Sequence, residues 1–184
     1  DLLSGQAVSV TAGATTPGID FALVLGGSIE GHVTDEATGT PLPNVWTVAY
    51  DSAGNFWSGA YSDTTGLYSI RGLASGDYRI RTWDSNGRVN ELYDDVSCPN
   101  WCDLSSGQAV SVTAGATTPG IDFALALGGS IEGHVTDQVT GAPLLNVWVE
   151  VYNDAGTYVD GRNTDSAGFY RVNGLPAGLY YLRT

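Results

Sequence analysis

The sequence predicts an all-β protein made of tandem antiparallel β-sandwich repeats, and three observations support this prediction. Glycine, valine, threonine and tyrosine are common and methionine is absent, a composition typical of short strands joined by turns. Apolar and polar residues alternate with a period of two in many short stretches. The stretch 4–31 recurs at 106–133 with a single difference, Val24 against Ala126. A repeat of this fidelity indicates an array of similar modules.

The alternation orders the expected strands along one repeat of 102 residues. In IDFALVL, for example, Ile19, Phe21 and Leu23 share one face. Turn-forming runs such as DSAGN and SDTTG separate the strands. About seven short strands per repeat suffice for a sandwich. We expect no helix, and strands at 7–11, 19–25, 28–34, 45–50, 56–61, 67–70 and 78–83.

The order of motifs within the repeat divides the chain into three parts. The run GGSIEGHVTD opens a unit, and SGQAVSVTAGATTPGIDFAL closes one. We therefore expect one complete β-sandwich at 27–127. Residues 1–26 are then the closing strands of a preceding repeat and candidate donor strands, and residues 128–184 are an incomplete following repeat. Since the chain starts in mid-repeat, we expect it to be a piece of something longer.

Two equivalent turns carry the most regular spacing in the repeat. Asp63 and Asp165 begin four-residue turns in which a carboxylate accepts backbone N–H groups. Gly66 and Gly168 suit a left-handed backbone position. We interpret all four as structural, and we expect the rings of the following tyrosines, Tyr68 and Tyr170, to lie in the core.

The longest matching runs carry a family resemblance. The segment from GHVTDEATGTPLPNVW to GLASGDYRIR, and its counterpart from GHVTDQVTGAPLLNVW to GLPAGLYYLR, resemble the carboxypeptidase regulatory-like domain. The resemblance implies a transthyretin-like (prealbumin-type) fold, so the fold class is one of tandem Ig-like or transthyretin-like sandwiches. It also implies an accessory module without peptidase activity, found in tandem in bacterial secreted and surface proteins.

The charge of the chain limits its partners. The formal net charge is −13, and all seven basic residues are arginines. Such a surface repels phosphate backbones and anionic membranes, so we expect no nucleic-acid partner. No stretch is apolar and long enough for a membrane span. Acidity fits a solvated surface, calcium binding or a salty exterior.

The two cysteines lie close together, as Cys98 and Cys102. In a chain of extracellular character this spacing predicts a disulfide that stiffens the long connection after residue 83. Zinc binding would need two further ligands, and each histidine lies alone in an expected strand.

An acidic cluster surrounds the cysteines. Carboxylates at flexible spacing are suitable calcium ligands, although the spacing is not that of an EF-hand, and a merely solvated loop is the alternative. The candidate calcium ligands are Asp84, Glu91, Asp94, Asp95 and Asp103. We expect no other cofactor. The sequence has no G-x-S-x-G or H-E-x-x-H motif, and we expect no enzymatic activity.

Aromatic residues form a candidate ligand or interface face. In VWVEVY the valines share one face, and Trp148, Glu150 and Tyr152 share the other. The same phase places Trp46, Val48 and Tyr50 outward in the first repeat. The candidate interface residues are Trp46, Tyr50, Trp148 and Tyr152, which are expected to stack on a sugar, pack on a neighbouring subunit, or lie under a loop of their own domain.

Two functions follow from these observations. The first is a structural repeat of an extracellular filament, stalk or adhesin shaft, whose partners are copies of itself or neighbouring repeats. Residues 1–26 of one copy would complete 128–184 of another by strand addition. The second is a carbohydrate- or ligand-binding accessory module of a secreted bacterial enzyme or adhesin, with Trp46, Trp57 or Trp148 contacting the sugar.

Overall fold

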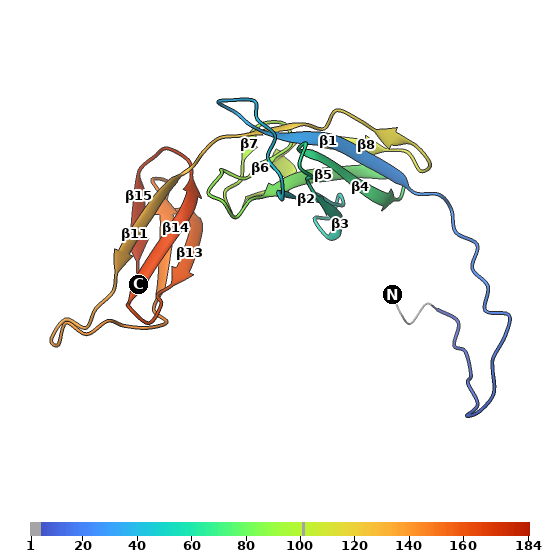
Figure 1. The fold of residues 1–184 in the computed structure, drawn as a ribbon, viewed down its shortest axis with the longest axis horizontal. Helices are drawn as coiled ribbons and strands as arrows, with labels where there is room; N and C mark the ends of the chain where they lie inside the picture. Colours follow the sequence, from blue (N-terminus) through green and yellow to red (C-terminus); the bar gives the residue numbers. More distant parts are fainter. Residues whose placement is uncertain (1–4, 101) are drawn as a thin grey trace.

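The structure, a computed structural model, describes residues 5–100 and 102–184. We call residues 27–127 the first unit and residues 128–184 the second unit. The repeated stretch is called the closing segment: its first copy, 5–25, precedes the first unit, and its second copy, 107–127, ends that unit. Figure 1 shows the first copy running away from the two units as extended chain.

The first unit is a sandwich of two sheets. One sheet has the order β10-β1-β4, with β9 also paired to β1, and the other has the order β3-β2-β5-β6-β7, with β8 also paired to β5. β1 and β4 are antiparallel, whereas β10 runs parallel to β1. The strands are β1 (Gly27–Asp35), β2 (Trp46–Tyr50), β3 (Phe56–Tyr61), β4 (Leu67–Leu73), β5 (Gly76–Trp83), β6 (Glu91–Leu92), β7 (Val96–Ser97), β8 (Ala109–Val112), β9 (Thr117–Thr118) and β10 (Phe123–Leu125).

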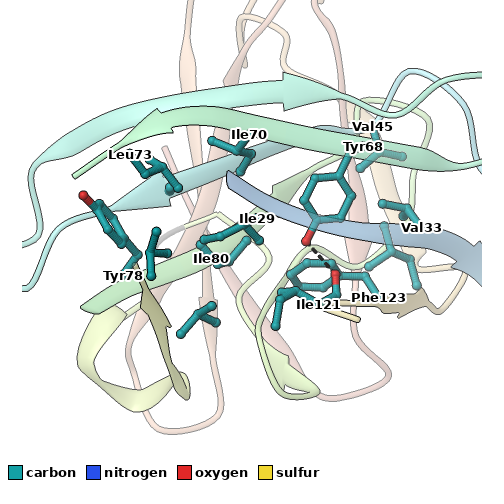
Figure 2. Close-up of a cluster of buried hydrophobic side chains, with 14 residues drawn as sticks. Ile29, Val33, Val45, Tyr68, Ile70, Leu73, Tyr78, Ile80, Ile121 and Phe123 are labelled. Atoms are coloured by element: carbon teal, nitrogen blue, oxygen red, sulfur yellow. Dashed lines mark hydrogen bonds between the residues drawn. The ribbon is translucent and has the colours of Figure 1, made fainter. Parts of the chain in front are cut away.

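The core lies between these sheets, because the inward side chains of both converge there (Figure 2). Ile29, Ile70, Leu73 and Ile80 are fully buried. Ile29 in β1 and Ile70 in β4 alternate with more exposed neighbours, as the period of two predicts, whereas Ile80 in β5 is followed by two further buried residues. Burial of this apolar surface is the main term that stabilises the unit.

The second unit repeats the first five strands. β11 (Gly129–His134) pairs with β14 (Phe169–Leu175), and β12 (Trp148–Asn153) lies between β13 (Tyr158–Asn163) and β15 (Tyr180–Arg183). Its core is small and consists of Val151, Val159, Val172 and Leu175.

The prediction of an all-β protein with antiparallel sandwich sheets is confirmed. Two expected strands are missing, because the first closing segment has no strand at 7–11 or 19–25. The second copy of the same residues forms β8 and β10. A short 3₁₀ turn, η2 (Leu104–Ser106), is the helical element of the described residues, and the Asp103 side chain accepts a hydrogen bond from the N–H of Ser105 at its start.

Candidate functional site

The second closing segment completes the core of the first unit. Val112, Phe123 and Leu125 are at most 4% exposed. The Phe123 ring lies 6.3 Å from the ring of Tyr68 and 6.1 Å from that of Tyr93. The segment therefore extends both sheets around the core, with β8 paired to β5 and with β9 and β10 paired to β1.

Polar contacts fix the register of this segment. The Tyr68 hydroxyl donates a 2.5 Å hydrogen bond to the carbonyl oxygen of Ile121 (Figure 2), and the His32 N–H donates to Oδ1 of Asp122 at 2.7 Å. Burial raises the pKa of Tyr68 far above its ordinary value, so this hydroxyl stays a donor. A Cβ on residue 31 would lie 1.9 Å from the Ile121 oxygen, so the close approach requires Gly31.

The first closing segment leaves the same side chains in solvent. Phe21 is 83% exposed and Leu23 is 89% exposed, whereas their repeat counterparts Phe123 and Leu125 are buried. Large exposed apolar side chains in a row are typical of an interaction surface.

Among the described residues, no closing segment pairs with the sheets of the second unit. Leu182 is 42% exposed, whereas its counterpart Ile80 is fully buried. A hollow of about 410 Å³ opens between β11, β14 and β15, and Val135, Val149 and Tyr170 help to line it. In the first unit, Val33 pairs with Phe123 and the Tyr68 ring packs near the Phe123 ring. Val135 and Tyr170 are the repeat counterparts of Val33 and Tyr68. The hollow therefore corresponds to the position that Phe123 occupies in the first unit.

The expected burial of the two tyrosines differs accordingly. Tyr68 is buried as predicted, but Tyr170 is only half-buried, which corrects the prediction for the second unit. The reason is that no closing segment lies against it among the described residues. The Tyr170 side chain lies instead against Gly133: a Cβ added to this glycine would be 3.0 Å from the tyrosine hydroxyl oxygen.

The two predicted turns are built as their residues suggest. Asp63 accepts hydrogen bonds from the N–H groups of Thr65 and Leu67, and Asp165 accepts equivalent bonds. The Thr65 hydroxyl and N–H lower the pKa of Asp63. Gly66 and Gly168 have φ values of 79° and 71°, in the left-handed region.

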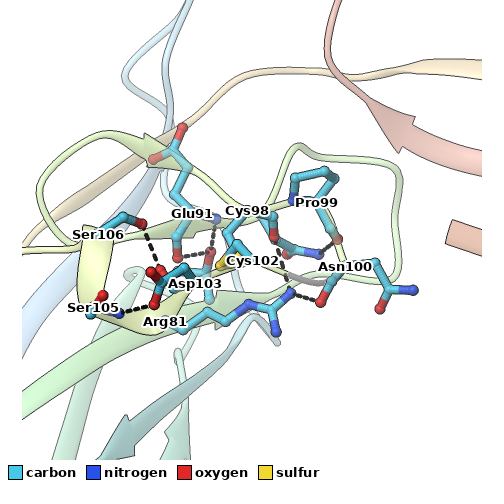
Figure 3. The surroundings of a disulfide bond; sticks show 11 residues. Arg81, Glu91, Cys98, Pro99, Asn100, Cys102, Asp103, Ser105 and Ser106 are labelled. Atoms are coloured by element: carbon cyan, nitrogen blue, oxygen red, sulfur yellow. Dashed lines mark hydrogen bonds between the residues drawn. A yellow bond between two sulfur atoms is a disulfide. The ribbon is translucent and has the colours of Figure 1, made fainter. Parts of the chain in front are cut away.

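Cys98 and Cys102 form a disulfide with a Cα–Cα distance of 5.4 Å (Figure 3). The loop that it closes lies over Arg81, whose guanidinium donates to the carbonyl oxygens of Cys98, at 3.0 Å, and Asn100. Burial lowers the pKa of Arg81 to about 10. Sequence analysis did not find this buried arginine, because Arg81 alternates with Ile80 like an outward residue.

The acidic residues near the disulfide have separate structural roles. Asp84 accepts hydrogen bonds in a turn from the N–H groups of Asn86 and Arg88, and Asp94 and Asp95 are exposed. Glu91 is half-buried, and burial, followed by the charges of Asp95 and Glu36, raises its pKa to about 7. Within residues 5–100 and 102–184, no group of three or more His, Cys, Asp or Glu residues is placed to hold a metal ion.

The predicted aromatic face is only partly exposed. Trp148 is 44% exposed, and Trp46, Tyr50 and Tyr152 are half-buried. Val48, expected on the same outward face, is 1% exposed but lies outside the core cluster between the sheets, so this part of the face is covered, which is one of the alternatives that the sequence left open. Val48 lies opposite Arg81 of β5, over which the disulfide loop folds.

Both tryptophans pack on a glycine of the adjacent strand. A Cβ at Gly59 would lie 2.6 Å from the Trp46 ring, and one at Gly161 would lie 2.5 Å from the Trp148 ring. Tyr152 donates a hydrogen bond to Glu150, which also accepts one from Arg183. The two units thus place equivalent residues equivalently, and differ where the closing segment is present or absent.

The fold and these sites define a tandem β-sandwich module protein. The model of the carboxypeptidase regulatory-like domain matches residues 28–126 and 130–184, and the chain belongs to this family. The resemblance inferred from the sequence motifs is therefore confirmed. No curated protein matches the chain.

Solved structures with a similar chain course include bacterial pilins. The Bacillus anthracis TIE protein is 22% identical, with 86% of this chain and 28% of that chain covered and a TM-score of 0.43. A streptococcal ancillary pilin is 16% identical over 86% and 53% of the two chains, with a TM-score of 0.41. GBS52, the minor pilin of Streptococcus agalactiae, is 15% identical over 85% and 82%, with a TM-score of 0.36. The chain thus spans about a quarter and a half of the first two proteins.

Proposed function

We propose that the chain is a non-enzymatic structural segment of a bacterial extracellular filament, stalk or adhesin shaft. In this proposal, the first closing segment of one copy completes the second unit of another copy by strand addition. The observation that carries it is the contrast between identical residues, buried at Phe123 and exposed at Phe21.

The second unit supplies a matching acceptor. Tyr170 and His134 stand where Tyr68 and His32 hold the second closing segment. By repeat correspondence, the Tyr170 hydroxyl would donate to the carbonyl oxygen of Ile19, and Phe21 would enter the 410 Å³ hollow. The contact joins two different surfaces, so it propagates head to tail and builds a fibre.

An extracellular location is part of this proposal. A disulfide persists in oxidising compartments, and the net charge of −13 keeps an exposed shaft soluble. Within the described residues, none of the helices is long and apolar enough to cross a membrane. A segment of a longer covalent array would use the same closure, with the strand supplied by the adjoining repeat.

Sedimentation velocity over a range of concentrations tests the proposal. We expect the parent chain to form concentration-dependent polymers, and expect these to be lost on deletion of Asp1–Gly26 and in Phe21→Asp, because a charge cannot enter the apolar hollow. Val24→Asp is the control, since Val24 is 88% exposed and its counterpart Ala126 lies outside the core cluster.

Two results would contradict strand addition. One is a deletion product that still polymerises. The other is a parent chain that stays monomeric at all concentrations and does not bind a synthetic peptide of residues 5–25. Negative-stain images of the parent chain would distinguish linear fibres from compact oligomers.

A further inference from the structure

A second candidate site lies at the junction between the two units, away from the closing segments. A cleft of about 500 Å³ is bounded by the ends of β2, β3 and β5, by the connection after β5, and by β13 and the β14 region of the second unit. Its volume is within the range of small-ligand sites, about 300–1,000 Å³. Neither unit alone forms both walls.

The two walls are held together by direct contacts. The Asn100 side-chain amide donates a 2.7 Å hydrogen bond to Oδ1 of Asp160, which is 5% exposed and also accepts from Arg162 at 2.7 Å. Asn100 belongs to the disulfide loop, and the Arg81 guanidinium donates a hydrogen bond to its carbonyl oxygen. The cleft is therefore preorganised, which lowers the entropic cost of binding a ligand.

Aromatic side chains form the wall contributed by the first unit. The rings of Trp46 and Tyr61 lie 4.5 Å apart at an interplanar angle of 43°, and Tyr61 is 64% exposed. Trp83 adds a third ring, and the guanidinium of Arg81 lies 3.5 Å from its centroid. Rings of this kind offer broad apolar faces beside polar tips, which suits a ligand with both apolar and polar surfaces.

The polar groups of the cleft indicate that this ligand is uncharged. Both arginines that line it are already paired with a carboxylate, Arg162 with Asp160 and Arg88 with Asp35. The lining residues therefore include no unpaired cation that could bind an anion, and the net charge of −13 repels anions at longer range. Asparagine, serine and aspartate side chains at the rim can exchange hydrogen bonds with hydroxyl groups.

We infer that this cleft between the units binds an uncharged oligosaccharide, with sugar rings stacked on Trp46 and Tyr61 and hydroxyl groups bonded to the rim. The inference is independent of strand addition, because no residue of either closing segment lines the cleft. It adds a binding function to a structural segment, and it makes the pair of units, rather than one unit, the binding element.

The repeat itself provides a matched control for the test. Trp148 is the counterpart of Trp46 and packs on Gly161 as Trp46 packs on Gly59, but it does not line the cleft. The full chain is titrated by isothermal calorimetry with hexasaccharides of β-1,4-glucose, β-1,4-N-acetylglucosamine, β-1,4-xylose and α-1,4-glucose, and with hexagalacturonate as the charged probe.

We expect at least one neutral hexasaccharide to bind. Tyr61→Ala and Trp46→Ala should weaken its binding by about 10-fold or more, because aromatic contacts carry a large share of the affinity in such sites. Trp148→Ala should leave the affinity unchanged. Tyr61 is exposed, so its variant tests the site even where Trp46→Ala perturbs the sheet. The inference is overturned by no binding of any neutral probe, by equal binding of hexagalacturonate, or by equal losses in Trp46→Ala and Trp148→Ala.

Discussion

Residues 5–23 and 107–125 have the same sequence and opposite environments. In the second copy Val112 is 4% exposed and in the first copy its counterpart Val10 is 77% exposed. The second copy pairs with β1 and β5, and the first pairs with nothing among the described residues. Strand formation here is decided by the presence of a partner, because the local sequence is constant.

The two units show the same effect from the acceptor side. Ile29 and Val33 are fully buried in the first unit, and their counterparts Ile131 and Val135 are half-buried in the second. One closing segment therefore determines whether a whole face of the sandwich is core or surface. The proposed strand addition between copies requires this dependence.

The largest difference in the free energy of unfolding is expected between alanine variants of two equivalent phenylalanines, one in each copy of the closing segment. Phe123→Ala should destabilise the first unit by about 3–5 kcal/mol, because it leaves a cavity beside Tyr68 and Tyr93. Phe21→Ala should change the stability of the dilute monomer by less than about 0.5 kcal/mol.

Urea unfolding followed by tryptophan fluorescence measures both variants, since four of the five tryptophans lie in residues 27–127. Equal effects of the two substitutions would show that the first copy also packs into a core in solution.

A smaller difference in the free energy of unfolding is expected between alanine variants of two equivalent glycines, Gly31 and Gly133. Gly31→Ala places a Cβ 1.9 Å from the backbone oxygen of Ile121, so either β10 must move or the strand must bend. We expect a loss of about 2–3 kcal/mol, in the range of core overpacking. Gly133→Ala meets only the Tyr170 side chain, at 3.0 Å, which can rotate away. We expect a loss below about 1 kcal/mol.

Thermal unfolding of Gly31→Ala and Gly133→Ala, each against the parent chain at low concentration, measures this difference. A large effect at Gly133 in polymers but not in monomers would sharpen the comparison, because it would place a donated strand against β11.

Sequence reasoning reached the all-β fold and the family, because both depend on local patterns. The alternation at 28–34, which forms β1, and the turns at Asp63 and Asp165 are readable without tertiary contacts. Burial of Arg81, which lies opposite Val48, was missed, since it depends on the disulfide loop folding over β5. The contact between Asn100 and Asp160 joins residues 60 apart, and no local pattern encodes it.

The smallest expected effect concerns Glu91, which lies in the connection after β5 of the first unit. Burial raises its pKa in the folded chain to about 7, above its ordinary value of 4.5. The folded state therefore binds the proton more tightly, so this contribution to stability is complete below pH 4.5 and is lost as the pH rises to about 7. Because Glu91 is only about half-buried, solvent screening reduces the effect to about 1 kcal/mol.

Glu91→Gln should remove this decline and be more stable than the parent at pH 8, as measured by urea unfolding at pH 4.5, 6 and 8. The carboxylates whose pKa values are lowered by hydrogen bonds, such as Asp35 and Asp63, lose their contribution only at more acidic pH, so they do not mask it. An unchanged decline in Glu91→Gln would assign the pH dependence to another group.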